Sequence, residues 1–189
     1  MRQWARNRAV LPMLCAALLA AVLAVPGSGV LVAFPSLTGG PGFAAPLSAL
    51  SPLLTAIALS AGFSRQNAAL ESLGLRRVWL LDLAVVAVAL AMAGTCVAVW
   101  GGEQLCAALR NAVGYCGLTL LSTAVLSLRT AALPAVAWAV GSAMGLFPLG
   151  DPLLTWPLAP TSAPLSWAIP LGLILVGPVA YLVRTPPSN

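Results

Sequence analysis

Long apolar stretches, separated by short polar or Pro- and Gly-containing segments, recur along the whole of this chain. A membrane-spanning helix needs about 20 mostly apolar residues to cross about 30 Å of hydrocarbon. Runs of this kind, bounded by charge, Pro or Gly, predict six helical spans. The spans cover residues 9–34, 43–63, 78–100, 111–128, 131–147 and 167–183. Between them lie a polar link at 64–77 and a Pro-rich outer segment at 148–166.

The composition indicates that the chain is solvated by a bilayer. Hydrophobic residues make up 60% of its 189 residues and charged residues only 7%, and the mean hydropathy is +0.99. Soluble domains carry about 25% charged residues. We therefore predict an all-α polytopic membrane protein in which residues 1–189 form a single transmembrane domain surrounded by membrane lipid.

The arginines predict how the chain is oriented, because basic residues in short loops stay on the cytoplasmic side. With the amino terminus inside, eight of the nine basic residues fall on the inner side and only Arg110 on the outer side. We therefore expect a multi-pass protein of the plasma membrane with both termini in the cytoplasm. The first span also reads as a signal peptide, but Pro26 stands where a cleavage site needs a small residue, so we retain the span.

The residue types present exclude several kinds of chemistry. The chain has no Lys and no His, which removes the Walker A loop, the Ser-His-Asp triad and imidazole metal sites. Its four cysteines form no Cys-x-x-Cys spacing, although Cys96, Cys106 and Cys116 fall at one predicted outer level where a pair could oxidise. We expect no enzyme, no bound metal or cofactor and no nucleic-acid partner.

Asp82 is the only acidic residue that falls well inside a predicted span. Intramembrane carboxylates are costly and usually find a partner inside the bundle. Arg129 lies at the same predicted inner level, as do Arg76 and Arg77. We favour a structural ion pair between Asp82 and Arg129 over a proton or substrate site, since no second acidic residue or His lies at depth.

The predicted outer half contains the candidates for a substrate path. These are Asn111 and Tyr115 in the fourth span and Trp138 in the fifth, with Glu103 at an outer vestibule. The alternative is that such residues only cap and anchor helices. The Pro-rich segment 148–166 cannot form a straight helix, and we expect an outer cap or a shallow, broken re-entrant segment.

The polar link at 64–77 reads as a short amphipathic helix on the cytoplasmic surface. Its charged side chains include Arg65, Glu71, Arg76 and Arg77. Both an interfacial helix under anionic headgroups and a docking element for a soluble partner fit this pattern.

Two short stretches, together with the layout, resemble a known class. Ala-Leu-Glu-Ser-Leu-Gly-Leu-Arg-Arg at 69–77 and Leu-Arg-Asn-Ala-Val-Gly-Tyr-Cys-Gly-Leu at 109–118 look like stretches in small actinobacterial permease-like proteins. The six-span layout resembles permease subunits of ABC transporters of the second exporter type. The resemblance implies docking to a separate ATP-binding subunit through Arg65, Glu71, Arg76 and Arg77. It also implies a second permease copy or homologue, giving a homodimer or heterodimer that moves an apolar or amphipathic substrate.

Two other functions fit the same sequence. One is a six-span substrate-binding subunit of an importer, which would gather Glu103, Asn111, Tyr115 and Trp138 around one pocket. The other is a membrane scaffold or accessory subunit without a transport path, which would pack all its spans tightly.

Overall fold

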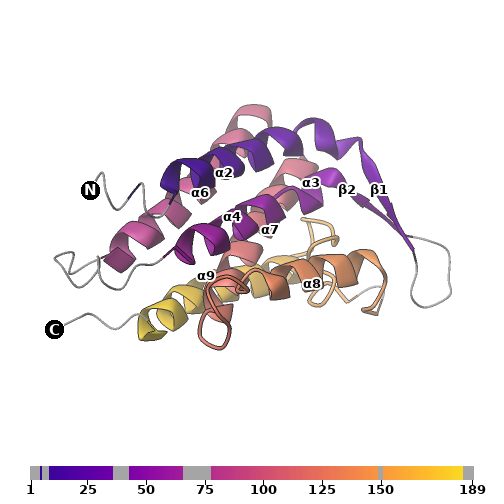
Figure 1. The fold of residues 1–189 in the computed structure, drawn as a ribbon. Coiled ribbons are helices and arrows are strands. Elements are labelled where there is room, and N and C mark those ends of the chain that lie inside the picture. Colours follow the sequence, from indigo (N-terminus) through magenta and orange to yellow (C-terminus); the bar gives the residue numbers. More distant parts are fainter. Residues whose placement is uncertain (1–4, 6–8, 36–42, 66–77, 149–150, 185–189) are drawn as a thin grey trace.

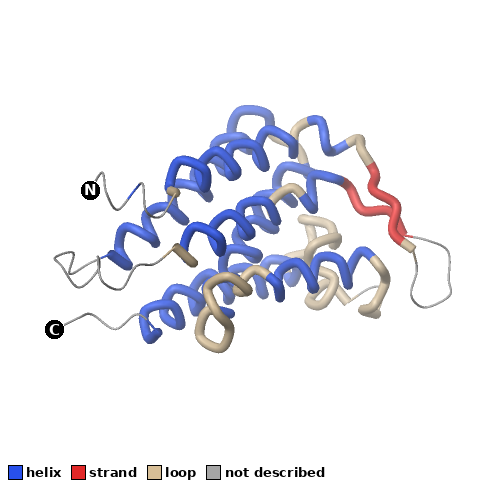
Figure 2. The backbone as a smooth tube through the Cα atoms, viewed as in Figure 1, coloured by secondary structure: helices blue, strands red, loops and turns tan. Residues whose placement is uncertain are grey.

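The computed structural model describes residues 5, 9–35, 43–65, 78–148 and 151–184, and these form a mostly helical bundle with one small hairpin (Figures 1 and 2). The predicted helical character is confirmed. The helices are α2 (Val10–Ala24), α3 (Leu47–Leu50), α4 (Leu53–Phe63), α6 (Val78–Trp100), α7 (Glu103–Ser122), α8 (Leu133–Ala143) and α9 (Leu165–Arg184), with a 3-10 turn η1 (Pro26–Ser28). The strands β1 (Leu31–Phe34) and β2 (Phe43–Pro46) pair antiparallel, with Leu31 opposite Pro46 and Phe34 opposite Phe43.

Three helices among the described residues are long and apolar enough to cross a membrane, which supports a membrane protein. They are Trp79–Trp100, Glu103–Ser122 and Leu165–Val183. Three further apolar helices are shorter: Val10–Ala24, Leu47–Phe63 and Leu133–Ala143. At 1.5 Å per residue, the 11 residues of α8 extend only about 16 Å, roughly half of the hydrocarbon thickness.

The first two predicted spans are wrong at the ends that face the hairpin. Residues 9–34 do not form one helix: α2 ends at Ala24, the Pro-Gly-Ser turn follows, and Leu31–Phe34 is a strand. The span at 43–63 likewise begins with strand β2 and is helical only from Leu47. The chain leaves the helix where Pro26 and the glycines after it disfavour helix. Pro52 separates α3 from α4 because it has no N–H to continue the first helix, although it suits the start of the second.

The boundaries of the fourth and fifth spans also need correction. Helix α7 starts at Glu103, eight residues before the predicted start at Asn111, and ends at Ser122, so that 123–132 forms turns. Helix α8 ends at Ala143 instead of reaching Phe147. The charges of Glu103 and Arg110 suggested a loop there. In the fold they belong to the first two turns of a long helix.

Helix α7 lies at the centre of the bundle and packs most closely against α9. A Cβ atom added at Gly117 would stand 2.6 Å from the backbone N of Ile174, and one added at Gly177 would stand 2.5 Å from the carbonyl oxygen of Gly117. Glycines at both positions therefore let the two backbones approach directly, as small residues do at helix contacts in membranes. The buried core around this contact includes Cys116, Leu120 and Tyr181.

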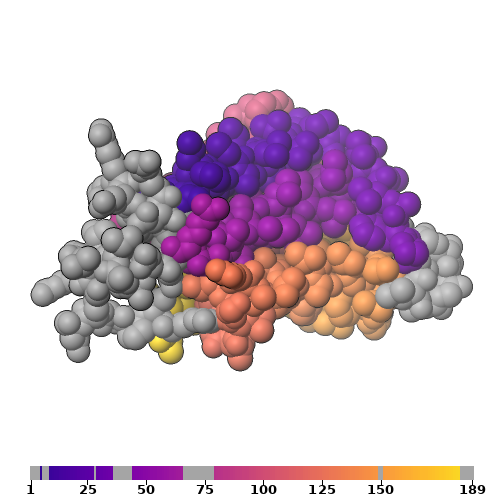
Figure 3. All heavy atoms as spheres, in the orientation of Figure 1, coloured from indigo at the N-terminus to yellow at the C-terminus, as the bar shows by residue number. Residues whose placement is uncertain are grey.

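Several helices begin or end at one end of the bundle, and the β-hairpin lies at the other end. Figure 1 shows that α2 begins, α4 ends, α6 begins and α9 ends toward one side, while the β1–β2 hairpin lies at the other. Figure 3 shows α2, α4 and α8 side by side in one continuous surface between these ends. We call the two ends the terminal end and the hairpin end.

Candidate functional site

Three polar side chains of α7 are completely buried near the hairpin end. Arg110, Asn111 and Tyr115 each have 0% of their surface exposed. Asn111 Nδ2 donates to the carbonyl oxygens of Ala49, at 3.1 Å, and Pro157, at 2.9 Å. The Tyr115 hydroxyl donates to the same Ala49 oxygen at 3.4 Å. This side of α7 thus connects α3 to the Pro-rich segment.

Arg110 extends the same polar network toward α9. Its Nη1 donates to Ser166 Oγ at 2.8 Å and to the carbonyl oxygen of Pro160 at 3.4 Å, and its Nε donates to Asn111 Oδ1 at 3.4 Å. The other terminal nitrogen, Nη2, is buried without a hydrogen-bond partner among the described residues. Arg110 was expected in the outer segment before the fourth span, but it lies within α7 and is buried, because Pro160 and Ser166, 50 and 56 positions away, accept hydrogen bonds from its guanidinium.

The Pro-rich segment is irregular and partly buried. Residues 151–164 form turns, and irregular backbone is tolerated at membrane depth only where protein or a water-filled cavity supplies its hydrogen bonds. Side chains from neighbouring helices do so here. Trp138 Nε1 donates to the carbonyl oxygen of Leu154 at 2.9 Å, and Trp167 Nε1 donates to that of Thr161 at 3.2 Å.

Trp156 anchors this segment in the core, with 0% of its surface exposed. Its ring lies against Tyr115, with centroids 5.2 Å apart, and against Gly114, where any Cβ would collide with the indole. Trp138 packs against the same cluster. The close contact with Gly114 shows that the ring belongs to the interior of the fold.

A cleft of about 320 Å³ opens beside this network at the hairpin end. Its volume is near the lower limit of small-molecule sites. Glu103 and Gln104, both exposed, line it from the first turn of α7. The other lining residues come from the hairpin, α3, α7 and the Pro-rich segment: Leu31, Pro46, Ala49, Ala107, Pro157, Leu158, Ala159, Pro160 and Thr161.

The structure brings most of the predicted substrate-path residues together, but behind the cleft wall. Asn111 and Tyr115 share the carbonyl of Ala49, which lines the cleft, and Trp138 joins their aromatic cluster. None of these three lines the cleft itself. Of the four residues considered for a pocket, Glu103 alone does so. The wall residues at 157–161 were missed because hydropathy does not report how a Pro-rich segment folds back.

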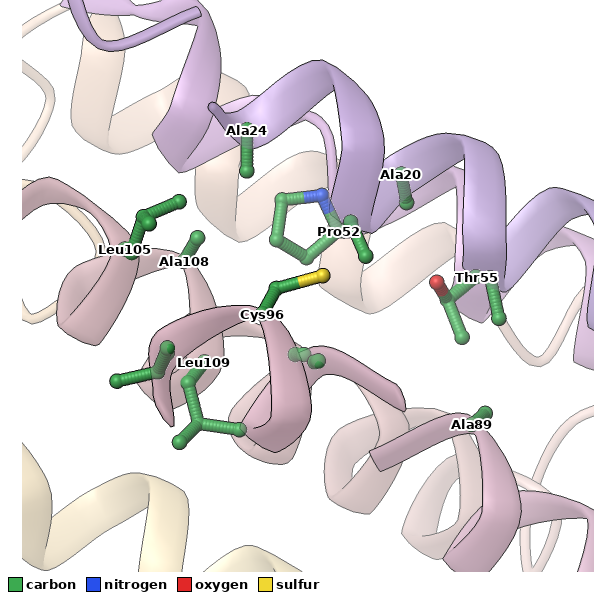
Figure 4. A pocket seen from close by; sticks show the side chains of 14 residues that line it. Ala20, Ala24, Pro52, Thr55, Ala89, Cys96, Leu105, Ala108 and Leu109 are labelled. Atoms are coloured by element: carbon green, nitrogen blue, oxygen red, sulfur yellow. The ribbon is translucent and has the colours of Figure 1, made fainter. Parts of the chain in front are cut away.

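The interior of the bundle offers far less space. A gap lined mainly by alanines lies between α2, α4, α6 and α7, and the Cys96 side chain points across it toward Pro52 (Figure 4). Its volume is about 20 Å³, which accommodates about one water molecule. The four cysteines are all free in this structure. No solute-sized space is therefore found at this position in the bundle.

The terminal end carries the predicted Asp82 site. Asp82 is 1% exposed, and the Tyr181 hydroxyl donates to its Oδ2 at 2.6 Å. The Tyr181 ring lies 5.5 Å from that of Phe63. The side chain of Arg129, the partner expected for Asp82, is exposed, and its carbonyl oxygen accepts a 3.3 Å hydrogen bond from Ser60 Oγ. Asp82 thus joins α6 to α9 through a neutral donor.

Of the four predicted docking residues, the structure describes one. Arg65 is exposed just after α4, whereas Glu71, Arg76 and Arg77 lie outside the described residues. Within the described residues, no group of three or more Cys, Asp or Glu side chains could hold a metal ion.

No protein-family model, no curated protein and no solved structure matches this chain.

Proposed function

We propose that this chain is a solute-binding membrane subunit of a transport system and that the cleft at the hairpin end is where it meets its solute. The cleft is the observation that carries the proposal. It combines a volume suited to a small molecule with walls that carry mostly apolar side chains, polar surface between them, and a polar mouth at Glu103 and Gln104. A solute that fits these walls is apolar or amphipathic.

The membrane topology that goes with this function is six passes in the plasma membrane, with both termini on the cytoplasmic side. The three long helices cross completely. The shorter helices are completed by irregular segments, as α8 is by the partly buried turns at 151–164. The placement of α2, α4, α6 and α9 supports both termini on one side, since α2 begins and α9 ends at the terminal end (Figure 1).

Charge placement supports the same orientation. Ser60, in the last turn of α4, donates to the carbonyl oxygens of Leu128 and Arg129, which brings Arg129 to the end where Arg65 leaves α4. Glu103 lines the cleft at the opposite end. Basic residues retained on the cytoplasmic side would put the terminal end inside and the cleft outside.

Energy for transport would come from a separate ATP-binding subunit, as the resemblance to ABC permeases suggests. Helix α4 ends and α6 begins at the terminal end, away from the cleft (Figure 1). A cytoplasmic subunit would dock at this end, through the residues 64–77 that connect the two helices in the chain. In the exporter form of this proposal, a second copy or a homologous permease completes the path. The cleft at one end of a closed bundle favours the importer-type binding subunit over this exporter half.

A non-transporting scaffold is the second candidate. The small volume of the alanine-lined gap, about 20 Å³, is the observation in its favour, because a scaffold needs no path through its helices. Binding of a small molecule in the cleft is the property that separates the two functions.

Affinity purification from native membranes in mild detergent tests the transport assignment. We expect an ATP-binding subunit to copurify with the tagged chain and to be lost from a variant with Glu71, Arg76 and Arg77 replaced by Ala. Replacing Arg2, Arg6 and Arg8 by Lys changes three arginines elsewhere, keeps the positive charge that orients the first span, and should leave recovery unchanged. Recovery of the tagged chain alone, while a known membrane complex stays intact under the same conditions, would refute the ATPase partnership.

A further inference from the structure

The cleft at the hairpin end has one charged lining residue among those the structure describes, and it is an acid. Glu103 stands at the mouth, exposed to solvent, in the first turn of α7. Gln104 and Thr161 are the only other lining residues with polar side chains. A bound solute can therefore form an ion pair with the cleft lining only if it carries a positive charge.

The backbone of the cleft wall is also poor in hydrogen-bond donors. Pro46, Pro157 and Pro160 line it, and proline has no N–H. The N–H groups of Leu158 and Ala159 already donate to the carbonyl oxygen of Thr155, at 2.9 and 3.0 Å. A wall built in this way offers a carboxylate or phosphate few donors.

The guanidinium of Arg110 does not reverse this preference. Arg110 follows Glu103 by seven residues, about 10 Å along the helix, and is 0% exposed. It does not line the cleft. Its Nη1 is engaged by Ser166 and Pro160, and its Nη2, which has no hydrogen-bond partner among the described residues, is buried away from solvent. Solvent-exposed Glu103 is thus the charge that an entering solute meets first.

From this arrangement we propose that the cleft binds an amphipathic amine, with the ammonium group on the Glu103 carboxylate and the apolar part against the walls. Leu31, Pro46, Ala107 and Leu158 supply the apolar surface. The inference rests on the proposed function, because it takes the cleft as the solute site and adds the chemical class of the solute.

Three probes of similar size separate charge from shape. They are 2-phenylethylammonium, neutral 2-phenylethanol and anionic 3-phenylpropanoate. Each is titrated into the full chain in phosphatidylcholine nanodiscs, with calorimetric heats from empty nanodiscs subtracted. We expect the amine to bind the most tightly and Glu103→Gln to weaken it about fivefold, in keeping with an exposed ion pair. The affinity for 2-phenylethanol should not change.

Two matched variants control for net charge and for position. Asp151→Asn removes the same charge outside the cleft lining and keeps a side-chain oxygen for the cap on the Leu153 N–H, so amine affinity should stay the same. Gln104→Glu adds a second carboxylate to the mouth and should strengthen amine binding. Thermal unfolding midpoints of all variants establish that they are folded.

A cleft-filling variant separates failure of this inference from failure of the proposed function. Ala107→Phe should abolish binding of every probe that uses the cleft. If the three probes bind the wild-type chain equally, or if Glu103→Gln leaves amine affinity unchanged, while Ala107→Phe blocks binding, the amine assignment is overturned and solute binding stands. If no probe binds above the empty-nanodisc background, both are overturned.

Discussion

Helices α6 and α7 follow each other in the chain and are similar in length, but they occupy opposite environments. The span at Trp79–Trp100 is the more hydropathic, yet only 17% of it is buried within the protein. The span at Glu103–Ser122 is the least hydropathic of the three long helices, and 67% of it is buried. In a soluble protein the more apolar helix would be expected inside. In lipid, apolar side chains gain little by leaving the solvent, so packing and hydrogen bonding decide which helix is central.

The two helices show this difference residue by residue. Along α6, positions such as Ala84, Val88, Ala91 and Val99 are exposed and need no protein partner in lipid. Along α7, Arg110, Asn111 and Tyr115 are 0% exposed and each bonds to another segment. Polar residues are costly in a bilayer, and the interior of the bundle is where α7 obtains their hydrogen bonds.

The largest effect should come from adding one methyl group to a glycine on each helix. Gly117→Ala on α7 would force a Cβ to within 2.6 Å of the backbone N of Ile174. Because the backbone of α9 can move away only at a large energetic cost, we expect the free energy of unfolding to fall by about 3 kcal/mol or more. Gly94→Ala on α6, where nothing lies within 4 Å, should change stability by less than about 1 kcal/mol. Equilibrium unfolding in mixed micelles compares the two, and equal effects would contradict the central position of α7.

A smaller effect is expected from removing a buried amide of α7. Asn111→Leu leaves the carbonyl oxygens of Ala49 and Pro157 without this donor, which should cost about 2 kcal/mol. Gln104→Glu, on the exposed first turn of the same helix, keeps an oxygen to accept from Ser48 Oγ and should stay within about 0.5 kcal/mol. If Asn111→Leu proves neutral in the same unfolding assay, the polar network does not hold the Pro-rich segment.

The smallest expected loss of stability comes from removing the hydrogen bond that joins α6 to α9. Tyr181→Phe removes the hydroxyl that donates to Asp82 at 2.6 Å, and we expect a loss of about 1 kcal/mol. Tyr115→Phe removes a longer hydrogen bond, at 3.4 Å, and should cost less. The ranking is measured by unfolding both variants side by side. The reverse order would show that Asp82 does not depend on the tyrosine.

Some features of this fold could be predicted from the amino-acid order. Helices α6 and α9 lie where long apolar runs between polar boundaries predicted them, because such runs carry their own signal for helix in a bilayer. Pro26 and Pro52 also interrupt the helices, because the missing N–H acts locally, although the predicted spans at 9–34 and 43–63 ran through them. Asn111, Tyr115 and Trp138 stand out in the sequence as polar or large aromatic residues within apolar runs. The structure places them close together behind the cleft wall.

The true start of α7, the burial of Arg110 and Trp156 and the existence of the cleft depended on the tertiary structure. The buried side chains depend on groups distant in the chain. Arg110 donates a hydrogen bond to Ser166, Asn111 donates one to Ala49, and Trp156 fills the space left by Gly114. Hydropathy sums the cost of placing each side chain in lipid and contains no information about such partners. The sequence alone therefore determined which segments are apolar enough for a membrane, and the packing of those segments decided which polar groups could be buried among them.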